Sequence, residues 1–315
     1  EARIGLAESE RAIAAASAAE LRRDVELQVR ALAYEWLSAA ADAEIVEEIA
    51  ERSRAMIELL RHRPVAGPAM LLDLQIIEAS LVEFQHAARE ISAQRDIARR
   101  SLNLLMGRAP DAPLQIKDTL AIPATTYALD ALMQQLDYNP GLLKRLAETK
   151  RALHEVEAAR AEAKPDYSLA PFVSREDAGE EETTVGLAVT LPVAWRNRNQ
   201  GAITAASARH AAAEAQVAAD LLAARAELAR IHRLYEAAVE QVKAISPELV
   251  AQLHDAADLA DRQYRLGAIP VNLFLEMQRE FLSVQALRRN ALLEALKKEA
   301  ELRWISADGR QEGIR

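Results

Sequence analysis

Hydrophobic and polar positions follow a helical period over most of the chain. Residues 1–62 form an amphipathic pattern without an internal proline, which predicts one helix of roughly 90 Å at about 1.5 Å per residue. A turn rich in proline and glycine follows at residues 63–68, and a second helix is predicted over 69–106, ending at Gly107. Such long helices joined by a short turn predict an antiparallel coiled-coil hairpin.

The second half of the chain predicts another helical hairpin. Asn139 and Pro140 are typical of a helix start, because asparagine caps the first turn and proline lacks only a donor that would be unsatisfied there. That helix is expected over 139–164. A long helical hairpin follows over 202–304, with a restart at Ser246-Pro247 and a reversal at Gly267.

Between these helices, the period changes to two over residues 167–192. Apolar residues alternate there with small or polar ones and predict a strand with one apolar face: Val185, Leu187, Val189 and Leu191. Residues 167–175 alternate less cleanly, and residues 176–182 form an acidic segment with a glycine, so an antiparallel hairpin is expected. Its arms of roughly nine residues would match a membrane when tilted.

The two halves of the chain also form an internal repeat. Tyr34-Glu35 and Tyr235-Glu236 are separated by 201 positions, and Gly67 and Gly267 by 200. We therefore predict repeat 1 over 1–107, a linker over 108–138 that carries a short helix at about 129–136, repeat 2 over 139–309, and a tail over 310–315. At this offset residue 1 aligns with residue 202, so repeat 1 is expected to be N-terminally truncated and to lack its own hairpin.

Composition supports long helices and argues against several classes of protein. Half of the residues are hydrophobic, yet only 4% are aromatic and there are 10 glycines. The net charge is −9, with acidic and basic residues intermixed, so no nucleic-acid partner is expected. The absence of cysteine excludes disulfides and thiolate metal sites within these residues. No apolar run approaches the roughly 18–20 residues of a spanning helix, so strands would have to make any membrane span.

Several segments resemble the outer membrane efflux protein family of TolC-like channels. They are Asn139-Pro140-Gly141-Leu142, Pro165-Asp166 before a strand, Val185-Gly186-Leu187 to Leu191-Pro192, and Arg196 to Gly201 before an alanine-rich helix. The segment Tyr264-Arg265-Leu266-Gly267-Ala268 is similar to the family's second helical turn, and Leu104 to Pro110 is similar to its repeat-closing segment. The pattern from Leu191 to Gly201 is also similar to the heavy-metal-exporting, CzcC-like branch.

This resemblance implies a fold and an assembly. The expected fold is mainly α with a β-hairpin: long antiparallel coiled-coil hairpins form an α-barrel, and strands contribute to a trimeric transmembrane β-barrel. The expected place is the bacterial outer membrane, with the helices extending into the periplasm. The partners implied are two further copies in a homotrimer, outer-membrane lipid, a periplasmic adaptor protein and an inner-membrane efflux pump.

The resemblance also implies pore and gate residues. Family members carry acidic side chains shortly after each helical turn, and the matching residues here are Asp73 and Glu276, with polar Asn272 beside Leu273, which occupies a position where an acid is expected. Three copies of an acid around an axis would repel one another and attract cations. Structural explanations remain open: the helix dipole favours Asp73 in a first turn, and Glu276 fits a solvated helix face.

The helical turns are the implied docking sites for the adaptor. Around the second turn the candidates are Arg265, Leu266, Gly267 and Ala268, because an exposed turn needs no leucine for folding. Gly67 marks the first turn. Both glycines also have a simple structural explanation, since glycine permits a tight chain reversal.

No catalytic pattern is present in the sequence. The nucleophile elbow, the phosphate-binding glycine loop and the dinucleotide fingerprint are all missing. The six histidines form no His-x-x-x-His pair and are expected to be surface helix residues. We therefore expect no enzyme activity, no cofactor and no metal site.

The predicted function is a passive exit duct for metal cations or small toxic compounds, with energy supplied by the partner pump. A soluble periplasmic coiled-coil or adaptor-like scaffold is the alternative, because long alanine-rich hairpins also suit that class. The strands of membrane length argue against it.

Overall fold

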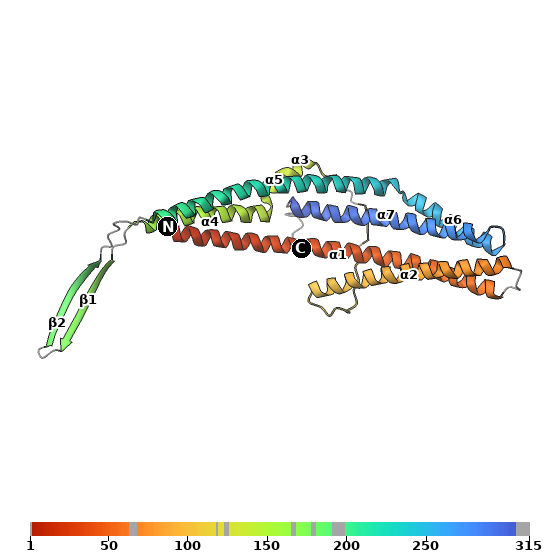
Figure 1. Cartoon of the computed structure of the whole chain (residues 1–315), viewed down its shortest axis with the longest axis horizontal. Coiled ribbons are helices and arrows are strands. Elements are labelled where there is room, and N and C mark those ends of the chain that lie inside the picture. The colour runs from red at the N-terminus through yellow and green to blue at the C-terminus, as the bar shows by residue number, and fades with distance from the viewer. Residues whose placement is uncertain are drawn as a thin grey trace. The chain divides into compact units, whose positions relative to one another are not determined.

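The computed structural model of the chain describes residues 2–62, 68–117, 119–122, 126–164, 168–177, 181–190 and 199–306. The elements, labelled in Figure 1, are α1 (Ala2–His62), α2 (Pro68–Leu105), α3 (Leu129–Gln135), the 3₁₀ helix η1 (Leu136–Tyr138), α4 (Pro140–Glu162), β1 (Ser168–Asp177), β2 (Glu181–Thr190), α5 (Gln200–Ala244), α6 (Pro247–Arg265) and α7 (Val271–Ile305). They form two compact units. The strand-bearing unit comprises residues 1–21 and 136–225, and the helical unit comprises 22–135 and 226–315.

The helix boundaries follow from local capping chemistry. The Asn139 side chain accepts hydrogen bonds from the backbone N–H groups of Gly141 and Leu142, at 2.9 and 3.3 Å, and so opens α4 as predicted. The Ser246 hydroxyl accepts from the N–H of Leu249 at 3.2 Å and opens α6. At the end of α2, Gly107 has a φ of 68°, the left-handed conformation that terminates many helices.

The strand-bearing unit holds a regular antiparallel hairpin. Its register pairs Leu169 with Val189 and Val173 with Val185, so these apolar residues share one face, as the alternation predicted. The predicted acidic turn over 176–182 was wrong in extent. Glu176 pairs with Glu182 and Asp177 with Glu181, so both strands run further than expected. The backbone ladder thus continues through acidic positions, and charge alone was therefore a poor marker of the turn.

The opposite face of the hairpin is small and polar except at one place. The ring of Phe172 lies over Gly186, and a Cβ built on this glycine would come within 2.5 Å of the ring. Glycine is thus needed there to make room for the aromatic side chain. Beyond the hairpin, an ion pair between Arg145 and Asp220, at 3.0 Å, connects α4 to α5.

The helical unit is held together by apolar clusters between two helical hairpins, α1 with α2 and α6 with α7 (Figure 1). The largest side chains of the first cluster are fully or nearly fully buried: Met56 from α1, Ile77 from α2, and Phe274 and Leu275 from α7. A second cluster lies further along the same helices and includes Ile49, Phe84, Ala257 and Phe281. The narrow apolar contact between long helices is the arrangement predicted from the sequence.

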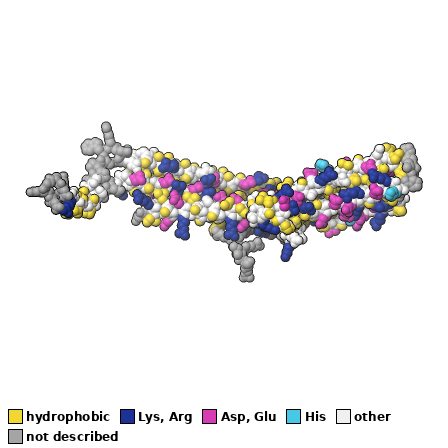
Figure 2. All heavy atoms as spheres, turned by 90° about the horizontal axis from the view of Figure 1, so that it is seen from below, with side chains coloured by type: hydrophobic (Ala, Val, Ile, Leu, Met, Phe, Trp, Pro, Cys, Tyr) yellow, Lys and Arg dark blue, Asp and Glu magenta, His cyan; other side chains and the backbone are white. Residues whose placement is uncertain are grey.

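Charged side chains cover the helices between these clusters. Figure 2 shows basic and acidic residues intermixed along the helical surface, in line with the many exposed pairs spaced three or four residues apart, such as Arg22 with Glu26 and Arg230 with Glu227. Such exposed pairs individually contribute little to stability. No helix in the described part of the chain combines the length and apolarity needed to cross a bilayer.

Candidate gate and docking residues

The turn between α6 and α7 is closed by backbone hydrogen bonds around Gly267. The N–H of Gly267 donates to the carbonyl of Tyr264, and the N–H of Ala268 donates to that of Gln263, both at 2.9 Å. Gly267 has a φ of 74°, which a side chain with a Cβ rarely adopts. Leu266 stands at the turn with 78% of its surface exposed. The predicted reversal is therefore confirmed, and it presents an apolar side chain to solvent.

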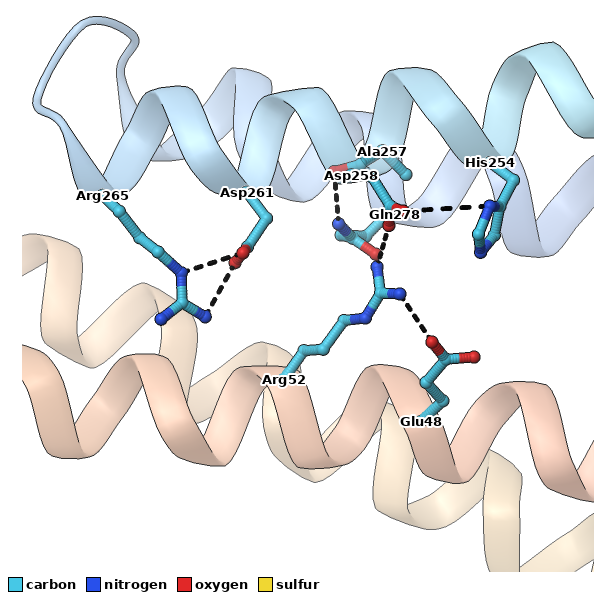
Figure 3. A network of polar contacts seen from close by, with 8 residues as sticks. All are labelled: Glu48, Arg52, His254, Ala257, Asp258, Asp261, Arg265 and Gln278. Carbon is cyan, nitrogen blue, oxygen red and sulfur yellow. Dashed lines mark hydrogen bonds and ion pairs between the residues drawn. The ribbon is translucent and has the colours of Figure 1, made fainter.

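Arg265 is held along its own helix. Two of its guanidinium nitrogens lie 2.8 and 3.2 Å from the carboxylate of Asp261, one turn earlier, as Figure 3 shows. This forked pairing fixes the direction of the guanidinium group. The Arg265 guanidinium is thus held against its own helix, one residue before the exposed Leu266. The other predicted turn residue, Gly67, lies outside the described residues.

Asp73 joins the two helical hairpins. The hydroxyl of Tyr264, on α6, donates a 3.0 Å hydrogen bond to the carboxylate of Asp73, on α2. The Tyr264 ring stacks on Phe274 with ring centroids 5.3 Å apart, and only 7% of its surface is exposed. Sequence reasoning gave Asp73 a pore role or a helix-dipole role and missed this partner, which is 191 positions away.

Glu276 and Asn272 lie one helical turn apart on the exposed side of α7. Their neighbours Phe274 and Leu275 point into the core, with 1% of each exposed. Within the described residues Glu276 has neither an ion pair nor a hydrogen bond, so its carboxylate faces solvent. The structure therefore places these two candidates on a shared face, away from the Asp73–Tyr264 contact.

A polar network further along the helical unit was not predicted. Arg52 on α1 bonds both Glu48 on its own helix and Asp258 on α6, and His254 lies on the other side of Asp258 (Figure 3). Gln278 of α7 is buried and donates to the carbonyl of Ala257 at 3.0 Å. The helical periodicity of the sequence could not predict this network, because its central ion pair joins residues 206 positions apart.

The predicted linker contains a second network that the sequence did not indicate. The Tyr127 hydroxyl donates to Glu299 at 2.8 Å and accepts from Arg303 at 3.0 Å. Burial raises the pKa of Tyr127, and burial together with the nearby Glu299 carboxylate raises the pKa of Tyr235 to about 12, so both phenols stay neutral hydrogen-bonding groups. Their rings meet edge to face, with centroids 5.6 Å apart.

His232 shows that one histidine was wrongly predicted to lie on the surface. Only 9% of it is exposed, and its Nε2 lies 2.8 Å from the backbone carbonyl oxygen of Tyr127. The ring therefore helps to hold the linker against α5. Within the described ranges, no group of three or more histidine, aspartate and glutamate residues is arranged to hold a metal ion.

The chain is similar to a known protein family and to a known resistance protein. The family model described as outer membrane efflux protein matches residues 131–307. The cobalt-zinc-cadmium resistance protein CzcC of Cupriavidus metallidurans is 25% identical over 201 residues, which cover 64% of this chain and 48% of CzcC. The match thus spans about half the length of that relative.

Solved structures share the fold over nearly the whole chain. The outer membrane protein VceC of Vibrio cholerae matches with a TM-score of 0.78 and 22% identity, covering 97% of this chain and 75% of VceC. The open state of the MtrE outer membrane channel of Neisseria gonorrhoeae matches with a TM-score of 0.79 and 16% identity, covering 96% of this chain and 70% of MtrE. These matches confirm the predicted fold class.

Proposed function

Because the chain belongs to the outer membrane efflux protein family, as its sequence motifs predicted, we propose that it forms the outer-membrane exit duct of a tripartite efflux system. Three copies would assemble around an axis, with their hairpins in lipid and their helices in the periplasm. A periplasmic adaptor would dock at the helical turns, and an inner-membrane pump would supply the energy. The duct itself would be passive.

The exposed apolar face of the β-hairpin is the observation that carries this proposal. Leu169, Val173, Val185, Leu187 and Val189 share one face, and each is 61–75% exposed. In water this face would cost free energy, since about 25 cal/mol is lost for each Å² of apolar surface left in contact with the solvent. Contact with lipid removes that cost, and the small, polar opposite face suits a water-filled lumen.

The cargo we propose is metal cations, with small toxic compounds as the wider class. The similarity to the cobalt-zinc-cadmium resistance protein supports this choice. The described helical surface adds the exposed acids of α7, such as Glu276, which would favour cations if they faced the duct.

The test is a matched pair of single charges on the hairpin. Val185→Glu places a carboxylate on the apolar face, and Thr184→Glu places the same group on the opposite face one residue away. Near the membrane centre, a charge on the lipid face of a barrel costs about 2–4 kcal/mol for lysine or arginine and less for glutamate, whereas the lumen face tolerates it. Purified chains would be reconstituted in planar lipid bilayers, and conductance would be recorded in potassium and zinc salts.

With the complete protein that contains this chain, we expect conductance from the original sequence and from Thr184→Glu, and its loss in Val185→Glu with the helical content unchanged. A complete protein that remains in solution and never conducts would instead support the periplasmic scaffold. Equal effects of the two substitutions would also contradict the assignment of the two faces.

A further inference from the structure

The ion pair between Arg52 and Asp258 is the central link of the network in Figure 3. Arg52 belongs to α1 and Asp258 to α6, so the pair joins the two helical hairpins of the helical unit. The two side chains are 25% and 34% exposed, which shields the pair partly from solvent. Its strength therefore depends on which other groups compete for either partner.

Both partners have such a competitor at hand. The second guanidinium nitrogen of Arg52 lies 2.5 Å from the carboxylate of Glu48, one turn earlier on the same helix. On the other side, Nδ1 of His254 lies 4.0 Å from the second carboxylate oxygen of Asp258, one turn earlier on α6. Glu48 can thus keep Arg52 paired within α1, and a protonated His254 can neutralise Asp258 within α6.

The charge of His254 decides between these arrangements. A neutral imidazole leaves Asp258 with Arg52 as its only cationic partner among the groups drawn in the network. A protonated imidazole attracts Asp258 and repels Arg52, and Glu48 is in place to accept the released guanidinium. Within the described residues, the charged partner of His254 is Asp258 of α6, which is in turn paired with Arg52 of α1, and Arg52 is paired with Glu48. From α7, the uncharged ring of Phe281 packs against His254 with ring centroids 5.0 Å apart.

We propose that His254 acts as a pH-dependent regulator of the contact between the two helical hairpins: its protonation weakens the Arg52–Asp258 ion pair and loosens α6 from α1. Only the consequence for transport rests on the proposed function: if the chain forms a duct, its helices separate more readily in acid. The structural coupling itself is independent of transport and can be measured without it.

The experiment measures the separation of α1 and α6 in the full chain. The sequence has no cysteine, so Glu51→Cys and Gln252→Cys, both exposed and outside the network, give two unique sites for spin labels. Distances would be measured by pulsed electron paramagnetic resonance at pH values of about 5.5 and about 7.5, either side of the usual histidine range near 6.5. Glutamate and aspartate with ordinary titration stay ionised at both values.

We expect the population with the longer α1–α6 distance to grow about two- to fivefold at the lower pH, the range that a partly exposed ion pair can supply. Every labelled chain also carries Asp42→Asn, because burial raises the pKa of Asp42 to about 6 and its charge would otherwise change between the two pH values. In this background His254→Gln should give the same distribution at both pH values, because the variant carries no titrating group at this position. In Arg52→Gln the longer distance should be populated at both pH values. Circular dichroism would check that each variant keeps its helices.

Two outcomes would overturn the proposal. One is a distance distribution in the original chain that does not change with pH, and the other is a pH response that persists at full size in His254→Gln. Neither outcome bears on bilayer conductance, so a failure here is distinguishable from a failure of the proposed duct.

Discussion

At the scale of single residues, Asp42 shows burial and ion pairing acting in opposite directions. Its carboxylate lies 2.7 Å from Nε of Arg289, and the side chains of Asp42 and Arg289 are only 21% and 13% exposed. Burial raises the pKa of Asp42 to about 6 from the ordinary 3.8, and the attraction of Arg289 only partly offsets this rise. A close ion pair is thus not by itself evidence of a stabilised carboxylate.

The raised pKa predicts how stability changes with pH. Folded Asp42 holds its proton more tightly than the unfolded chain does, so its contribution to stability is fully present below pH 3.8 and is lost as the pH rises through about 6. At about 1.36 kcal/mol per unit, the loss amounts to at most about 3 kcal/mol. Asp42→Asn cannot titrate and serves as the reference.

Chemical denaturation of both proteins at pH 4 and pH 7 measures this effect. The free energy of unfolding of the original chain, relative to that of Asp42→Asn, should fall over this interval. A relative stability that instead rises with pH would mean that Arg289 dominates over burial and that the pKa of Asp42 is lowered.

Residue-level predictions from the sequence named positions but could not name the partners of those residues. The order of residues placed Asp73 and Glu276 shortly after their turns, and the structure assigns them different surroundings. Asp73 receives a hydrogen bond from Tyr264, whereas Glu276 faces solvent. Because such partners come from distant parts of the chain, helical spacing carries no information about them. The same reason explains why the environments of Tyr127, His232 and Arg52 were missed.

At the scale of elements, local chemistry predicted most of the structure. Asn139, Ser246, Gly107 and Gly267 marked helix ends correctly, because each supplies a cap or a left-handed residue that acts within one turn. The helix expected to begin at residue 202 begins at Gln200, so the predicted polar segment before it extended too far along the chain. The hairpin turn was misjudged in the same way, since polarity alone does not stop a ladder or a helix.

The turn at Gly267 yields a prediction about one such element. A Cβ at this position would meet nothing within 4 Å, so substitution acts through the backbone and not through a clash. Gly267→Val should lower the free energy of unfolding by about 1–2 kcal/mol, because an L-residue resists the left-handed conformation. Gly267→Asn, which tolerates that conformation better, is the matched control and should cost less.

The same pair of variants tests the proposed docking role of Arg265, Leu266, Gly267 and Ala268. In the complete efflux system, Gly267→Val should weaken adaptor-dependent export, measured as resistance, while trimer formation is retained. Gly267→Asn should export more nearly as the original chain does. Unchanged resistance in Gly267→Val, despite the loss of stability, would remove the turn from the docking surface.

At the scale of the whole molecule, the chain can be divided either by its proposed sequence repeats or by its compact packing units. We propose the division by repeats, with repeat 1 over 1–107, the linker over 108–138 and repeat 2 over 139–309. The compact units cut differently, since residues of α1 and α5 belong to both of them. The difference has a physical cause: a long helix makes contacts with different neighbours along its length, so units defined by packing need not follow units defined by sequence repetition.

In the assembled trimer, we expect Glu276 to influence which ions pass through the duct. In the proposed trimer, three copies of its solvent-facing carboxylate would surround one axis at the narrow end of the duct, and their mutual repulsion would be relieved by bound cations. Glu276→Gln removes this charge without changing the shape of the side chain. Glu294→Gln removes an equal charge from an exposed site on the same helix, roughly 27 Å further along at 1.5 Å per residue.

Reversal potentials in planar bilayers under a salt gradient distinguish the two positions. Glu276→Gln should lower the preference for potassium over chloride, whereas Glu294→Gln should leave it close to that of the original chain. Equal shifts in both variants would mean that selectivity follows total charge, and no shift in either would place Glu276 outside the conducting path. A shift confined to Glu276→Gln follows from a constriction, because a charge acts strongly on a passing ion only within about one Debye length, about 8 Å at physiological ionic strength.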